Sequence, residues 1–116
     1  MNFKDFQEKT CQTALYPAES KELAMSYLTL GLCGEAGEVA EIIKKLLRKG
    51  IPMSELQRPK TETRHLKDQI RDELGDVLWY IGQICEQCDL DMGDVASRNI
   101  EKLEQRSKEK NIQKLD

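Results

Sequence analysis

The 116-residue chain lacks the features of several large classes of protein. Aromatic residues make up 5%, and there are only three prolines and seven glycines, too few turn residues for an all-β fold of many short strands. No run of about 18 apolar residues is present, so we expect no membrane-spanning helix and no membrane partner. No hydrophobic segment follows the first lysine, so we also expect no secretory leader. With 34% charged and 39% hydrophobic residues, the composition is typical of one helical domain.

The chain also lacks an excess of positive charge and the cysteine spacing of a zinc site. Eighteen Lys and Arg face 21 Asp and Glu, and the net charge is −3, so we expect no nucleic-acid partner. Among four cysteines, only Cys85 and Cys88 are closely spaced, which argues against a structural zinc ion. Without an export signal, we expect these thiols to be reduced and the protein to be cytoplasmic.

Four helical stretches cover most of the chain. We expect them at about residues 2–14, from Ser20 to Gly50, and at about residues 63–88 and 92–107. Segment 51–61 contains two prolines and is expected to be a loop. The prediction is therefore an all-α fold, an antiparallel bundle of about four helices, with a single domain over residues 1–107 and a polar tail over 108–116.

The length of the second and third helices predicts an oligomer. Each has about 25 residues or more, which corresponds to roughly 40 Å at 1.5 Å per residue. Two such helices with apolar residues on more than one face cannot bury all of them within one small chain. We therefore expect a homodimer or homotetramer in which a second copy completes the bundle.

Four carboxylates share the apolar faces of these two helices. Glu35 and Glu38 lie on the apolar side of the second helix, and Glu73 and Asp76 on that of the third. Burying an unpaired carboxylate costs several kcal/mol, and a group of them also repels itself. The same faces offer few Lys or Arg partners, whereas hard divalent cations favour carboxylate oxygens. We therefore expect these residues to hold Mg²⁺, with Mn²⁺ as the alternative.

Three segments carry a resemblance to a known family. They are GLCGEAGEVAE at residues 31–41, DELGDVLWY at 72–80, and NIEKL at 99–103 with Arg106. In this order and spacing they resemble the MazG-like nucleoside triphosphate pyrophosphohydrolases, an all-α family related to the dimeric dUTPases. The resemblance runs from about Tyr27 to Arg106, most of the chain.

The resemblance implies an enzyme and assigns roles within it. It implies that the four carboxylates bind Mg²⁺, and that Asn99 and Lys102 reach the phosphates or sugar of a nucleotide. The implied reaction converts a nucleoside or deoxynucleoside triphosphate to the monophosphate and pyrophosphate, with nucleotide-pool cleansing as a suggested role. The family often has a further glutamate directly before the first motif acid. Here Gly34 occupies that position, so the role of that glutamate is not carried over.

A second role for Glu38 and two aromatic residues complete the predicted site. Glu38 is expected to accept the proton of the attacking water. Tyr80 lies on the face of Glu73 and Trp79 is adjacent, so either ring can stack on the nucleobase, and core packing is the alternative for both. The pattern leaves open the base, the sugar, the phosphorus that is attacked and the number of ions.

Two other kinds of protein share parts of this pattern. A di-metal carboxylate bundle also gathers acids between helices, but it normally uses Glu-x-x-His pairs, and no histidine follows the acids here at that spacing. A non-enzymatic, homo-oligomeric interaction module explains the long amphipathic helices. It does not explain four acids on apolar faces.

Overall fold

The computed structural model describes residues 1–115, and their side chains as far as residue 110. The helices in chain order are α1 (Phe3–Thr10), α2 (Lys21–Arg48), α3 (Ser54–Gln57), α4 (Arg64–Gln87) and α5 (Met92–Leu115). A 3-10 turn, Cys11–Thr13, follows α1 directly. The described residues contain no strand, and the predicted all-α class is confirmed.

Two predicted boundaries are wrong. The segment expected to be a loop contains the one-turn helix α3, because Pro52 lies before the N-cap Met53, where its missing N–H removes no helical hydrogen bond. The last helix was expected to end near residue 107, but α5 continues to Leu115. Residues 108–115 are mostly Lys, Glu, Gln and Leu, which are good helix formers. Residue 116 of the predicted tail lies outside the described residues.

The ends of α2 are fixed by local sequence. The Ser20 hydroxyl accepts a hydrogen bond from the Leu23 amide at 3.0 Å, which confirms the predicted N-cap. At the other end Gly50 adopts φ +67°, a left-handed conformation that glycine tolerates best. This turn lets the Ile51 amide donate to the Leu46 carbonyl at 3.0 Å and closes the helix.

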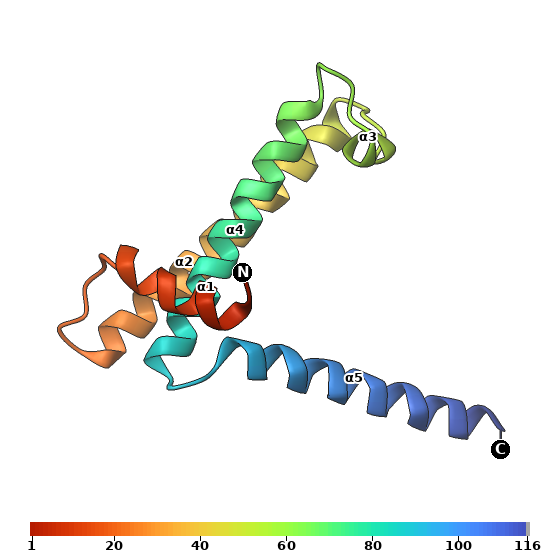
Figure 1. Ribbon diagram of the computed structural model, residues 1–116. Helices are drawn as coiled ribbons and strands as arrows, with labels where there is room; N and C mark the ends of the chain where they lie inside the picture. The colour runs from red at the N-terminus through yellow and green to blue at the C-terminus, as the bar shows by residue number, and fades with distance from the viewer. Residues whose placement is uncertain (116) are drawn as a thin grey trace.

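Helices α2 and α4 form an antiparallel pair that carries the rest of the chain (Figure 1). Helix α3 sits at one end of the pair, and α1 packs against α4 near the other end. Ile42, Leu46 and Leu66 form a buried cluster toward the α3 end, and Leu28 is buried farther along α2. The pair therefore sets which residues of α2 and α4 face each other.

Helix α5 extends away from the pair, so the single chain is elongated (Figure 1). The radius of gyration is 18.3 Å, whereas a compact chain of this length has about 13 Å. Large apolar side chains remain exposed along the long helices, including Leu30 at 73%, Leu47 at 69% and Ile100 at 54%. Oligomerisation stays a prediction that this exposed surface favours. Among the described residues, no helix has the length and apolar character needed to cross a membrane.

Candidate functional site

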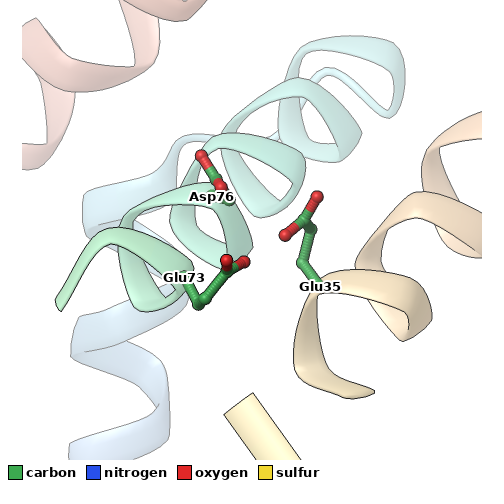
Figure 2. Close-up of side chains that lie close together, drawn as sticks. All are labelled: Glu35, Glu73 and Asp76. Atoms are coloured by element: carbon green, nitrogen blue, oxygen red, sulfur yellow. The ribbon is translucent and has the colours of Figure 1, made fainter. Parts of the chain in front are cut away.

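Three of the predicted carboxylates converge between α2 and α4. Glu35 reaches from α2 toward Glu73 and Asp76 on α4 (Figure 2). Each of the three residues offers one carboxylate oxygen, and these oxygens lie within 4.8 Å of one another. Glu73 and Asp76 are three residues apart and so share one face of α4. The antiparallel packing places that face opposite Glu35.

The cluster carries negative charge, and no Lys or Arg of the described side chains forms an ion pair with it. The pKa of Glu35 is raised from 4.5 to about 7, first by a hydrogen bond with Glu73, which Glu35 makes as a protonated acid, and then by partial burial and the charge of Asp76. Partial burial and the charge of Glu73 also raise the pKa of Asp76. The ion pairs among residues 1–110 all lie elsewhere on the molecule.

This donor set fits a hard divalent cation. Glu35, Glu73 and Asp76 offer only carboxylate oxygens, the ligands that Mg²⁺, Mn²⁺ and Ca²⁺ prefer. A cation at this place would replace the proton on Glu35 and remove the mutual repulsion. The three residues could therefore hold a metal ion.

Glu38 lies apart from this group, although its negative charge contributes to the raised pKa of Glu35. The expectation that all four acids face the interior is wrong as far as burial is concerned. Glu38 and Asp76 are exposed, and Glu35 and Glu73 are half-buried. The reason is that α4 is the one helix packed extensively on α2 in the described part of the chain, so the acidic face stays open.

A cleft of about 270 Å³ lies beside the acids. It is lined by Thr13, Glu35, Asp76, Trp79 and Tyr80. The structure thus brings both predicted aromatic residues to the cleft that holds two of the carboxylates. A larger hollow of about 690 Å³ lies between α1 and α5, but its residues do not form an acidic cluster of this kind. We therefore assign the site by its chemistry rather than by its size.

Gly31 allows Tyr80 to pack directly against α2. A Cβ atom added at position 31 would overlap the ring of Tyr80. A side chain there would therefore push the ring, or α4 with it, away from α2. Burial, followed by the neighbouring Tyr27, raises the pKa of the Tyr80 phenol. The glycine thus fixes the wall of the cleft next to the acids.

The other two predicted nucleotide contacts are not at the cleft within one chain. Asn99 and Lys102 are exposed on α5, which packs against α1 and α4 but projects away from the acids. Their role stays a prediction. Conversely, sequence reasoning gave no role to Thr13, which lines the cleft. A lone threonine at the end of a short 3-10 turn carries no sequence signal, since its position depends on how α1 docks on α4.

Comparison with known proteins identifies the family of the chain. Residues 23–110 match the family model described as MazG nucleotide pyrophosphohydrolase domain, and this segment contains all four acids. The chain is similar to the Gene 37 protein of Mycobacterium phage L5, with 37% identity over 110 residues that cover 91% of this chain and 89% of the relative. No solved structure gives a significant match. The match to the family model spans most of the chain, and the chain therefore belongs to the MazG nucleotide pyrophosphohydrolase family.

Proposed function

We propose that this protein is a Mg²⁺-dependent hydrolase that cleaves a nucleoside or deoxynucleoside triphosphate to the monophosphate and pyrophosphate. The observation that carries the proposal is the convergence of Glu35, Glu73 and Asp76 from two helices, with no Lys or Arg among residues 1–110 ion-paired to them. Membership of the MazG family supports the reaction class. Cleansing of the nucleotide pool is a role that this reaction would serve.

The three converging carboxylates would bind the metal ion. A triphosphate carries about four negative charges, and bound Mg²⁺, or Mn²⁺ in its place, would supply the positive charge that draws its oxygens to an acidic site. Glu35, Glu73 and Asp76 would orient the reacting phosphates through that charge. Their partial exposure leaves the site open to a substrate of this size.

Glu38 would act as the general base. Its carboxylate lies outside the group of three but close enough to influence Glu35, so it is free to accept a proton. The oxygen of water forms a bond to the α or β phosphorus, and its proton moves to Glu38. The P–O bond between these two phosphates breaks, and the leaving phosphate keeps the electron pair. Attack at either phosphorus gives the same two products.

The nucleoside would lie against the aromatic side of the cleft. Trp79 and Tyr80 line it next to Glu35 and Asp76, so a base stacked there would leave the phosphates near the acids. Asn99 and Lys102 would bind the phosphates or sugar from α5 of a second copy in a homodimer or homotetramer. This arrangement would cover exposed apolar residues and bring α5 to a site that it does not reach in its own chain.

Pyrophosphate release tests the proposal. Purified protein is incubated with MgCl₂ and a panel of standard and modified nucleoside triphosphates. We expect Glu38→Ala to lose at least about 100-fold in kcat, the lower range for loss of a general base. Glu73→Ala removes one of the three metal-binding carboxylates, and we expect it to abolish turnover. Glu41→Ala is the matched control, because Glu41 is exposed on α2 and paired with Lys44 at 3.0 Å.

Two results would count against the proposal. Turnover at the wild-type rate in both variants would show that these acids are not the site. Wild-type protein that releases no pyrophosphate from any nucleotide would favour the non-enzymatic interaction module instead. Circular dichroism of each variant checks that its helices are intact.

A further inference from the structure

A polar network fixes the segment between α1 and α2 onto α4. Gln83 on α4 is only 2% exposed. Its amide donates a hydrogen bond to the Thr10 hydroxyl at 2.8 Å, and its carbonyl accepts one from the Tyr16 hydroxyl at 2.7 Å. Gln87, one turn further along α4, donates to the same Tyr16 hydroxyl at 2.9 Å. Residues 10 and 16 are therefore both held in place, and the turn between them is anchored on each side.

Thr13 lies between these two anchors and holds Trp79. The indole N–H of Trp79 donates to the Thr13 hydroxyl at 2.7 Å, and that hydroxyl donates to the Thr10 carbonyl at 3.2 Å. The hydroxyl thus uses one donor and one acceptor function, and its acceptor function fixes the direction of the indole N–H.

Two tyrosines limit the remaining freedom of the indole ring. Tyr16 and Tyr80 lie at 6.4 Å and 5.1 Å from Trp79, measured between ring centroids, with interplanar angles of 89° and 83°. Neither tyrosine is stacked parallel on the indole, so neither competes for parallel stacking with a planar ligand. The hydrogen bond to Thr13 is therefore the directional contact that sets how the indole lines the cleft.

We propose that Thr13 is a positioning residue, which holds the Trp79 ring in the orientation that receives the nucleobase beside Glu35 and Asp76. This inference rests on the proposed function for its ligand, a nucleotide. The base is remote from the reacting phosphates, so its stacking contributes equally to the ground state and the transition state. Loss of that contribution raises KM and leaves kcat unchanged.

The test compares Thr13→Val, which removes the hydroxyl at nearly constant shape, with Thr13→Ser, which keeps it. We expect Thr13→Val to raise KM by about three- to tenfold, the effect of one hydrogen bond, with kcat within about twofold of wild type. Thr13→Ser should restore the wild-type KM. Thr29→Val is the matched control, because its exposed hydroxyl bonds only to carbonyls of its own helix.

Fluorescence reports on the same contact without any nucleotide, since Trp79 is the single tryptophan of the chain. We expect acrylamide to quench Trp79 more strongly in Thr13→Val than in wild type or Thr13→Ser. Unchanged quenching and unchanged KM in Thr13→Val would overturn the positioning role while the proposed function stands. If wild-type protein releases no pyrophosphate, the proposed function fails, and the quenching result still decides whether Thr13 holds the ring.

Discussion

Replacing Glu35 by glutamine should stabilise the metal-free protein and weaken its response to Mg²⁺. In the folded protein the pKa of Glu35 is raised from 4.5 to about 7, so at pH 8 folding forces an ionised carboxylate next to Glu73 and Asp76. A glutamine has no charge to repel, and its amide can donate a hydrogen bond to Glu73 as the protonated acid does. The substitution removes an unfavourable interaction and keeps the favourable one.

The size of the effect follows from the pKa. A change from 4.5 to about 7 corresponds to about 3 kcal/mol between the two protonation states. Glu35 is only half-buried, and water and salt screen its charge. We therefore expect Glu35→Gln to increase the free energy of unfolding at pH 8 by about 1 kcal/mol. For a domain of this size, that raises the midpoint of thermal unfolding by about 3–6 °C.

The raised pKa also fixes the direction in which the contribution of Glu35 to stability changes with pH. An acid whose pKa is raised on folding binds more protons in the folded state than in the unfolded state. Between pH 4.5 and about 7, the contribution of Glu35 to the free energy of unfolding of the metal-free wild type therefore falls as the pH rises. Glu35→Gln should match the wild type well below pH 4.5, where Glu35 is protonated in both the folded and the unfolded state, and exceed it at pH 8.

The assay is thermal unfolding in EDTA and in MgCl₂ at fixed protein concentration. Bound metal adds RT ln(1 + [L]/Kd), about 1.4 kcal/mol at ten times Kd, to the wild type and less to Glu35→Gln. Glu41→Gln, an exposed position on the same helix, should show neither effect. Equal midpoints of wild type and Glu35→Gln at pH 8 in EDTA would refute the repulsion on which the metal argument rests.

Two further predictions concern packing and assembly. Gly31→Ala should lower the free energy of unfolding by about 1–3 kcal/mol, because the new methyl group overlaps the Tyr80 ring. Gly34→Ala is its control and should gain up to about 1 kcal/mol, since nothing lies within 4 Å of a Cβ there; equal effects of the two in denaturant titration would contradict the close approach of Tyr80. Light scattering should give a mass of two or four times the 13.3 kDa chain. A monomeric mass at micromolar concentration would exclude a site that α5 of a second copy completes.

Local sequence determined most of the fold. Helical periodicity, the Ser20 cap and the Gly50 terminator are short-range signals, and they located α1, α2 and α4 to within a few residues. The boundaries that failed depend on weaker signals. Pro52 favours a loop by sequence, yet α3 begins two residues after it, and the polar end of α5 has no residue that stops a helix.

The site was predictable where helix geometry alone decides it. Spacing of three residues puts Glu73 and Asp76 on one face, and the apolar stripe turns Glu35 toward them. The positions of Glu38 and Thr13 depend instead on the register of α2 against α4 and on the docking of α1, which no single segment specifies. One chain does not bring Asn99 and Lys102 to the cleft, and periodicity within one chain cannot define the second copy that we propose.

Metal location tests the central claim most directly. Crystals grown with MnCl₂ and a nucleotide that cannot be hydrolysed between its α and β phosphates would show manganese by anomalous scattering. We predict a peak bound by Glu35, Glu73 and Asp76 that also contacts the phosphates. Manganese bound elsewhere, with these three side chains free of both metal and phosphate, would contradict it.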